Sequence, residues 1–550
     1  MLWAAYGDAL GFITELSNAQ GVSRRTDGVM RITEPVGWKR RIGGKFGVTI
    51  RLPAGCYSDD TQLRLATCRS IRSDGTFDVE TFSKIELPIW LSYALGAGRG
   101  TMIAANSLKR SNATWNSNFY RVDGSGYTEG GGNGGAMRIQ PHVWCAARHL
   151  TNANVLRQVI RNAIVTHGHP RGILGAAFHA LNLRDAVLCR EIPGPPRWRA
   201  IIDELDTLPE IISSDEELTF YWLPQWEKQT GQTLRESVSH ALEEMRLDAE
   251  QIERRMNAHA HTMEAYRELV REIGCMERRF VGAASKTALL AGYVGFAFHE
   301  RPHEGLVEVV NLLGSDTDTI ATMAGAILGV VARCDPPYPV MDQDYLIRES
   351  ERLYQISEGI PSSNKDYPDL LYWRPPAQQI DVIGKFHDKW AIQGLGYAEE
   401  MEIVAEQSGR TPTVWQWFRL EYGQCILLRR RAIPNVLAGN SLPASSETIP
   451  DRVPTGANGG RSTGVPVKEE TPRTLPLWAA HESGNVNSEP VSVDVASDKA
   501  INSDFRPDVV GSLLIELAQQ PYGIEKASSF AAIVAKAKRV RLRREQHRGS

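Results

Sequence analysis

Apolar residues recur at intervals of three and four along much of the first 340 residues, the spacing expected for one face of an α-helix. The stretch from Asp60 to Ile71 shows this pattern first. The same spacing predicts helices over residues 154–165, 172–183, 286–298 and 320–332. Strict alternation of apolar and polar residues is scarce, and residues 45–52 (KFGVTIRL) are the best candidate strand. The pattern therefore predicts a mostly helical domain over residues 1–340.

Shifts in composition divide the rest of the chain. Residues 191–280 begin with a proline-rich turn and continue as a charged helical run, which indicates a solvated helical insertion. Residues 341–434 carry many aromatic side chains, which could fill a small accessory core. Residues 435–505 are rich in Pro, Ser, Gly, Thr and Asn and are typical of a flexible linker. Residues 506–550 return to a helical pattern and end in a basic run.

Composition excludes several classes of protein. Lys and Arg number 62 and Asp and Glu 65, a formal charge of −3, so any surface that attracts nucleic acid must be local. The longest apolar run is too short to span a bilayer, and the first residues lack the pattern of a secretory signal. The seven cysteines are scattered and never spaced as C-x-x-C, which is typical of reduced thiols. We expect a cytoplasmic protein without membrane contact.

Two acidic clusters lie far apart in the sequence, each directly before an apolar helical run. They are Ser58-Asp59-Asp60-Thr61 and Gly314-Ser315-Asp316-Thr317-Asp318-Thr319. Helix capping is one explanation, because Ser, Thr and Asp accept hydrogen bonds from free N–H groups. A single Asp would satisfy a cap, however, and four carboxylates brought together would repel unless cations neutralised them. Oxygen ligands favour Mg²⁺ or Mn²⁺ over zinc, and such a set could hold two ions. Capping and metal binding both remain open.

Three shorter segments carry further candidate chemistry. Asp8 and Glu15 are seven residues apart, so a helix would place them near the same face, as surface carboxylates often are. The loop from Gly130 to Asn133 could let backbone N–H groups approach a phosphate. Thr166-His167-Gly168-His169-Pro170 predicts a turn with Pro at the first position of a helix. Its histidines could bind phosphate or metal, or could cap that helix.

Together these blocks resemble the signature of a known family. The segments GDALG…E, SDDTQL, NGGAMR, THGHP and GSDTDTIATMAGAILG are similar to the conserved blocks of the ADP-ribosylglycohydrolases, and they occur in the family's order. Ser58 stands where Thr is commoner, and Ser315 replaces a Gly, but each oxygen ligand is kept. The resemblance implies an all-α fold with a central cleft that holds two Mg²⁺ ions, or Mn²⁺. It also implies hydrolysis of an N- or O-glycosidic bond by a metal-activated water, which releases ADP-ribose from an acceptor.

The resemblance assigns roles to residues at matching positions. The implied metal ligands are Ser58, Asp59, Asp60, Asp316, Asp318 and Thr319. The implied substrate-binding residues, near the diphosphate and distal ribose, are Gly130, Gly131, Gly132, Asn133 and His167. Glu15 matches the family's mobile glutamate and is the candidate for proton transfer, whereas Asp8 matches an Asp expected to be structural.

Other functions remain as alternatives. A non-catalytic ADP-ribose-binding module would have lost ligands, yet the aspartates and Glu15 are all present. A binuclear metal phosphoesterase could also use paired Asp clusters, and its products would differ. The acceptor could be an ADP-ribosylated protein, a nucleic acid or a small molecule. The basic run near the C-terminus could make a weak, salt-sensitive contact with nucleic acid or with an acidic partner, or could be a solvated helix end. It consists of Lys536, Lys538, Arg539, Arg541, Arg543, Arg544 and Arg548.

Overall fold

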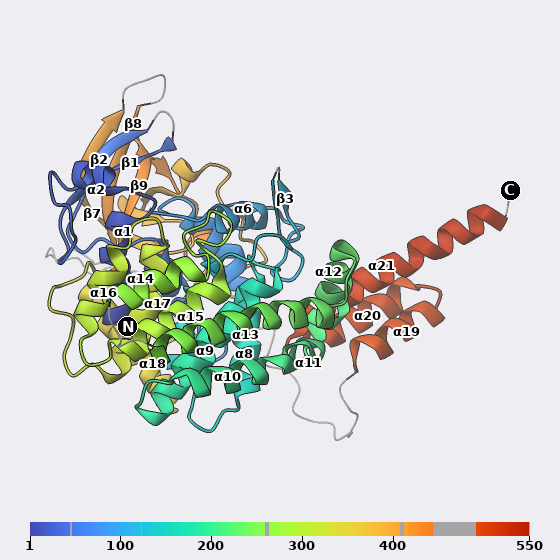
Figure 1. Cartoon of the computed structure of the whole chain (residues 1–550). Coiled ribbons are helices and arrows are strands. Elements are labelled where there is room, and N and C mark those ends of the chain that lie inside the picture. Colours follow the sequence, from blue (N-terminus) through green and yellow to red (C-terminus); the bar gives the residue numbers. More distant parts are fainter. Residues whose placement is uncertain (45–46, 123, 259–262, 408–411, 444–490, 549–550) are drawn as a thin grey trace, which may run out of the picture. The chain divides into compact units, whose positions relative to one another are not determined.

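The computed structural model describes residues 1–44, 47–122, 124–258, 263–407, 412–443 and 491–548. The chain divides into two compact units, Met1–Thr448 and Ile449–Ser550. About 54% of the chain is helical and 11% is strand (Figure 1). The expected all-α fold is therefore wrong for the chain as a whole, although the part that carries the acidic clusters is helical.

The first unit contains the helices α1 to α18, which lie between Leu2 and Ser357. They are α1 Leu2–Thr14, α2 Ala19–Arg25, α3 Asp59–Arg69, α4 Val79–Thr81, α5 Leu87–Trp90, α6 Arg99–Leu108, α7 Gln140–Trp144, α8 Asn152–Ile164, α9 Pro170–Cys189, α10 Pro195–Glu204, α11 Leu208–Ser213, α12 Leu223–Thr230, α13 Leu234–Ala258, α14 Met263–Glu272, α15 Ala284–Ala297, α16 Pro302–Val310, α17 Thr317–Val331 and α18 Gln343–Ser357. Short π segments lie at η2 Phe82–Glu86 and η5 Leu218–Trp222, and 3₁₀ turns at η3 Asn133–Gly135, η4 Leu205–Thr207, η6 Gln379–Asp381 and η7 Gly439–Ser441.

Each stretch with helical spacing is confirmed as a helix, namely α3, α8, α9, α15 and α17. Pro170 is the first residue of α9, and the His169 side chain before it accepts a hydrogen bond from the Arg171 amide. The predicted strand is confirmed in part by β2, Val48–Leu52, which pairs with the antiparallel strand β1, Trp38–Ile42. Residues 45–46 of that prediction lie outside the described residues.

Helices α1 and α17 pack against each other at a distance that only small residues allow. A Cβ atom on Gly7 would lie 2.3 Å from the Ala321 carbonyl oxygen, and one on Gly325 would lie 2.2 Å from the Trp3 carbonyl oxygen. The Thr322 hydroxyl donates to the Ala4 carbonyl oxygen at 2.8 Å. This contact brings the end of α1 close to the start of α17, although some 300 residues separate them.

A curled six-stranded mixed sheet follows α18. Its strands are β5 Ile383–Phe386, β6 Lys389–Ile392, β7 Gly396–Gln407, β8 Thr413–Leu420, β9 Cys425–Arg431 and β10 Asn435–Val436, in the order β10-β5-β6-β7-β8-β9. β10 runs parallel to β5, and the other neighbours are antiparallel. Strand β2 packs against β7, so the hairpin β1–β2 lies beside the sheet (Figure 1). A further short pair is formed by β3 Arg121–Val122 and β4 Ser125–Gly126.

The all-α expectation failed because the aromatic residues of 341–434 were not recognised as strand residues. Strand β8 carries Trp415, Trp417 and Phe418 among β-branched and polar residues, the composition of a pleated surface packed on one side. Burial extends to both faces over much of β8 and β9, so a simple alternation of apolar and polar residues is absent.

Buried polar contacts fasten the sheet to the helices. The Arg69 guanidinium on α3 makes two 2.7 Å hydrogen bonds to Glu86, and both side chains are fully buried. Arg69 also donates to the Gln424 side chain at 2.6 Å, and the Tyr367 hydroxyl donates to Glu86 at 2.6 Å. Because Gln424 directly precedes β9, this network joins the helical part to the sheet.

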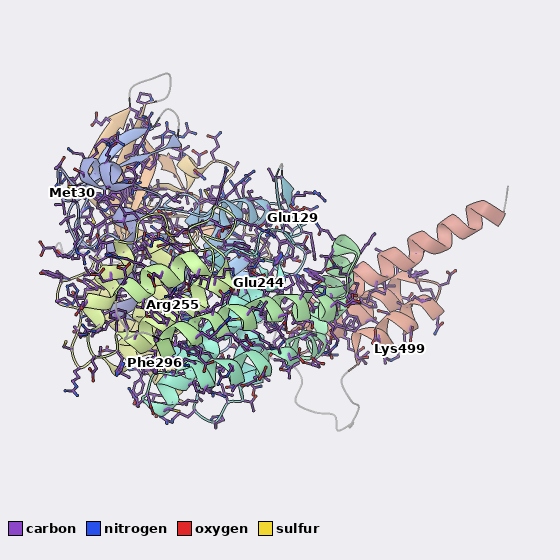
Figure 2. The ribbon with its side chains drawn as sticks, in the orientation of Figure 1. Met30, Glu129, Glu244, Arg255, Phe296 and Lys499 are labelled. Atoms are coloured by element: carbon purple, nitrogen blue, oxygen red, sulfur yellow. The ribbon has the colours of Figure 1, made fainter. Side chains whose placement is uncertain are left out.

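The segment 191–280 forms the helices from α10 to α14 and part of the surrounding core. Helix α13 packs against α9, α10 and α15, and its residues Leu242, Met245 and Ile252 are buried. Its acidic side chains also reach neighbouring helices. Asp248 accepts hydrogen bonds from Lys286 at 2.6 and 2.7 Å, and Glu244, labelled in Figure 2, accepts one from Arg171 at 2.6 Å.

The second unit contains α19 Val493–Asn502, α20 Pro507–Ala518 and α21 Gly523–Arg548, which pack on one another. Most of the predicted linker, residues 444–490, lies outside the described residues, as do nearly all side chains of the basic run. Before that gap, β10 and η7 belong to the sheet region. No helix within the described ranges is long and apolar enough to cross a bilayer.

The buried pair of Arg69 and Glu86 yields a stability prediction. Replacing Glu86 by Ala leaves the guanidinium buried without its carboxylate, which should lower the free energy of unfolding by about 3–5 kcal/mol. The matched control is Glu304→Ala, since Glu304 pairs with Arg301 at the surface and should contribute about 1 kcal/mol or less. Denaturant unfolding of the full chain measures both, and equal losses would contradict the assignment.

Candidate active site

Three helix ends bring the candidate carboxylates together. Glu15 follows directly after α1, Asp59 and Asp60 form the first turn of α3, and Asp316 and Asp318 lie at the N-terminus of α17. The side chains of Asp59, Asp60 and Asp318 are buried. A Cβ atom on Gly11 of α1 would lie 2.4 Å from the Asp318 Cα, so the close packing of α1 and α17 sets this arrangement.

The electrostatics show that the two acidic clusters meet in space. Burial raises the pKa of Asp60 well above its usual value, and the charges of Asp8, Asp59 and Asp316 raise it further. Burial also raises the pKa of Asp318, with further contributions from Glu15, Asp60 and Asp316. The carboxyl groups of residues 15, 59, 60, 316 and 318 are therefore close enough to repel one another, as a common site requires.

Asp8 holds the N-terminus of α3 in place. Its buried carboxylate accepts hydrogen bonds from the backbone amides of Ser58 at 2.9 Å and Thr61 at 2.8 Å. The Ser58 hydroxyl caps the same helix by accepting a bond from the Asp60 amide at 3.2 Å. These bonds satisfy free N–H groups of the first turn and fix the directions of Asp59 and Asp60.

The glycine-rich loop is tied to the second acidic cluster. The Asn133 side-chain amide donates to the Asp316 carboxylate at 2.7 Å and to the Thr287 hydroxyl at 3.2 Å. The Asn133 backbone amide donates to the Gly282 carbonyl at 3.0 Å. Gly130 and Gly131, with φ of +92° and +62°, adopt a backbone conformation that other residues rarely take. The loop therefore reaches the acidic cluster through Asn133.

His167 lies against this loop. A Cβ atom on Gly134 would be 3.3 Å from its Nε2 atom, and one on Gly132 would be 3.7 Å away. The Nδ1 atom lies 2.7 Å from the Thr166 hydroxyl. Burial lowers the pKa of His167 to about 3, so the imidazole is neutral and can act as a hydrogen-bonding group rather than a cation.

Glu15 has an environment suited to proton exchange. Burial raises its pKa to about 7, and the charge of Asp316 adds to the rise, while Arg40 opposes it. The Glu15 Oε2 atom lies 3.5 Å from a guanidinium nitrogen of Arg40 on β1. That guanidinium lies 4.3 Å from the centroid of the Phe12 ring. The sequence alone does not single out Arg40, because a cation in a short strand carries no distinctive signal.

The oxygen atoms of the cluster suit a hard divalent cation. The Asp60 Oδ1 atom is buried without a hydrogen-bond partner among the described residues. Carboxylate and hydroxyl oxygens are donors that Mg²⁺ and Mn²⁺ accept. In the described ranges, no three His, Cys, Asp or Glu side chains stand in a ready ligand arrangement, and Asp318 instead accepts a bond from the Thr319 amide at 3.0 Å. The assignment of ligands stays a prediction.

Comparison with known proteins agrees with the sequence signature. A sequence model of the ADP-ribosylglycohydrolase family matches residues 1–335. The ADP-ribosyl-[dinitrogen reductase] glycohydrolase of Rhodospirillum rubrum is 30% identical over 201 residues, which are 34% of this chain and 59% of that relative. The chain thus spans about three fifths of that protein's length.

A solved structure described as an ADP-ribosylglycohydrolase-related protein complex is also similar, with 20% identity and a TM-score of 0.37. The match covers 65% of this chain and 95% of that one. The family resemblance drawn from the sequence blocks is confirmed by the family match over most of the chain. The chain therefore belongs to the ADP-ribosylglycohydrolase family, whose members are glycosidic-bond hydrolases.

Proposed function

We propose that this protein hydrolyses the glycosidic bond between ADP-ribose and an acceptor, at the site formed by the ends of α1, α3 and α17. The observation that carries the proposal is the meeting of Glu15 with both acidic clusters beside the glycine-rich loop. Family membership supports the same class of reaction. The scissile bond would be an N- or O-glycosidic bond at C1″ of the ribose.

We further propose that Ser58, Asp59, Asp60, Asp316, Asp318 and Thr319 hold two Mg²⁺ ions, with Mn²⁺ as an alternative. Bound divalent ions would neutralise the carboxylates, orient the ribose hydroxyls and lower the pKa of a water. The buried, mutually repelling carboxylates supply a reason for such ions, since burial of uncompensated charge is costly.

Glu15 is the proposed proton-transfer residue. A carboxyl group with a pKa of about 7 is present in both protonation states near neutral pH, so it can accept a proton from water or donate one to the leaving group. Arg40 beside it limits the rise of that pKa and holds the side chain toward the cluster.

The loop and His167 are proposed to hold the ADP part. Backbone N–H groups of Gly130, Gly131 and Gly132 can approach phosphate oxygens closely, because these residues carry no side chains. Asn133 would link this binding to Asp316. Binding energy from the remote ADP part would support cleavage at the ribose.

The acceptor could be a protein, a nucleic acid or a small molecule, and the contact proposed for the C-terminal basic segment remains a prediction. A non-catalytic ADP-ribose-binding module would bind ADP-ribose without turnover. A phosphoesterase would instead release inorganic phosphate or AMP. Product analysis by liquid chromatography after incubation with ADP-ribosylated substrates separates these outcomes, since a glycohydrolase releases free ADP-ribose.

Removal of divalent ions should abolish the reaction reversibly. Treatment with EDTA should reduce release of ADP-ribose by at least about 10²-fold, and added Mg²⁺ should restore it, because the carboxylates would again be neutralised. The measurement is release of ADP-ribose from an ADP-ribosylated protein. Full activity in EDTA would defeat the proposed metal role.

Asp60→Asn should separate stability from metal binding. In EDTA the variant should unfold at the same temperature as the wild type or higher, since it removes one buried, repelling charge. With Mg²⁺ about a hundredfold above its Kd, the wild type should gain about 2.7 kcal/mol and the variant much less. Calorimetry measures both, with the exposed Asp206→Asn as control. A variant that gains as much as the wild type would remove Asp60 from the ligand set.

Glu15→Gln keeps the shape of the side chain and removes its proton exchange. We expect kcat to fall by about 10²–10⁴-fold, the range for loss of a general acid or base. Affinity for free ADP-ribose, measured by titration calorimetry, should change by about threefold or less. If kcat and affinity fell together by the same factor, Glu15 would only position the substrate.

A further inference from the structure

A cleft of about 880 Å³ lies where the helical part meets the sheet. One wall is the hairpin β1–β2, at residues 40–44, and another is the loop 91–97 with one face of α6. Strands β8 and β9 and the turn η6 close the remaining side. Residues of the sheet region therefore share a cavity with residues of the part that carries the acidic clusters.

The cleft is strongly cationic. Its lining includes Arg40, Arg41, Lys109, Arg429 and Arg431, and no Asp or Glu is found among the described residues that line it. These cations come from β1, the end of α6, and β9, so three separate chain segments contribute positive charge to the cleft. The acidic cluster of the candidate active site carries the opposite, negative charge.

Two of these cations are held by neutral groups. Lys109 Nζ donates to the Ala377 carbonyl oxygen at 2.9 Å, and Arg429 Nε donates to the Thr413 hydroxyl at 3.1 Å. Neither makes an ion pair with a carboxylate within the described part of the chain. Arg431 does pair with Asp381 at 2.9 Å, and Arg40 with Glu15 at 3.5 Å. The charges of Lys109 and Arg429 are thus positioned by the fold but not neutralised by it.

The cleft also offers an aromatic ring and amide groups. The half-buried Trp415 lines it, with its ring so close to the hairpin that a Cβ atom on Gly43 would lie 3.1 Å from a ring carbon. Asn106, Gln378 and Gln379 line the same space. Cations that contact phosphates, a ring on which a base can stack and amides that can bond base edges are the parts of a site for single-stranded nucleic acid.

The cleft and the acidic cluster share a wall. The Asp59 amide donates to the Leu95 carbonyl oxygen at 2.7 Å, and a Cβ atom on Gly96 would lie 3.1 Å from the Asp59 Oδ1 atom. Leu95 and Gly96 both line the cleft. Outside the cleft lining, at the start of α6, a Cβ atom on Gly100 would lie 3.6 Å from His167 Nε2. A single nucleic-acid strand bound in the cleft would therefore lie next to the acidic cluster.

We infer that this cleft, formed jointly by β1, α6 and the sheet, binds the acceptor, and that the acceptor is a single-stranded nucleic acid. The inference rests on the proposed function, since it names the acceptor class of that reaction. An acidic polypeptide would satisfy the cations, but it would leave Trp415 and the amides without the planar groups that they suit.

The test measures binding of a fluorescein-labelled 12-nucleotide single strand to the full chain by anisotropy at several salt concentrations. The double variant Lys109→Gln/Arg429→Gln should bind at least about tenfold more weakly. Loss of two phosphate contacts should reduce the slope of log affinity against log salt by roughly 1.4. The control double variant Lys389→Gln/Arg254→Gln, which changes two exposed cations that do not line the cleft, should bind like the wild type.

Asn106→Asp provides a second variant that the fold tolerates, because this side chain is exposed on α6. It adds a negative charge to the cleft and should also weaken binding of the oligonucleotide. Oligonucleotide affinity that is unchanged in both variants would overturn the inference. The inference would also fail if polyglutamate of equal charge bound as tightly as the oligonucleotide and lost affinity equally in the double variant. It would fail, too, if the double variant lost affinity for free ADP-ribose as much as for the oligonucleotide.

Failure of this inference is distinguishable from failure of the proposed function. Oligonucleotide binding is measured without turnover, and release of ADP-ribose is measured on a modified protein. If the chain released ADP-ribose from that protein while the cleft variants bound the oligonucleotide normally, only the present inference would fail. If no ADP-ribose were released from modified protein or modified oligonucleotide, the proposed function would fail, and the acceptor assignment with it.

Discussion

Repulsion between buried carboxylates is the interaction that the rest of this structure accommodates. Asp59, Asp60 and Asp318 are buried close together, with Glu15 and Asp316 beside them. Such a group persists only if protonation reduces its charge or positive potential balances it. The dipoles of α3 and α17, whose N-termini carry these residues, supply part of that potential. The remaining excess of negative charge is the physical reason for the proposal that cations bind here.

Rigid packing holds this unfavourable arrangement. Glycines on α1 let its backbone touch α17, and the Asp8 carboxylate fixes the first turn of α3. Separating α1 from α17, or moving the first turn of α3, would break buried hydrogen bonds. The glycine-rich loop is then joined to the same cluster by Asn133. The backbone contacts of α1, α3 and α17 therefore keep the repelling carboxylates in place, which gives a preorganised site.

Local periodicity explains why the helices were predictable and the sheet was not. Helices α3, α8, α9, α15 and α17 bury one or more faces at intervals that a single sequence reveals. Strands β8 and β9 take their environment from partners elsewhere in the chain, including the hairpin β1–β2. Their aromatic residues indicated a core but not its architecture.

Some residues of the candidate site and the cleft could likewise be predicted from the sequence, and others could not. Acidic pairs with interleaved hydroxyls and the glycine-rich loop are compact motifs, so the sequence alone indicated them. Arg40, Lys109 and Arg429 are single cations in unremarkable surroundings, and only the fold brings them to one cleft. The bond between Asn133 and Asp316 likewise depends on long-range packing that no motif encodes.

Asp342 has a consequence for where this protein can be divided. Its carboxylate accepts hydrogen bonds from the Tyr57 hydroxyl at 2.6 Å and from the Cys425 amide at 2.9 Å, so it links the residue before Ser58 to β9. The family match ends at residue 335, before this link. A chain cut at that boundary would lose Asp342, and with it the acceptor for the Tyr57 hydroxyl directly before the first residues of α3. The region that the family model matches is thus smaller than the unit held together by buried contacts, because the sheet that follows it also supports the segment leading into α3.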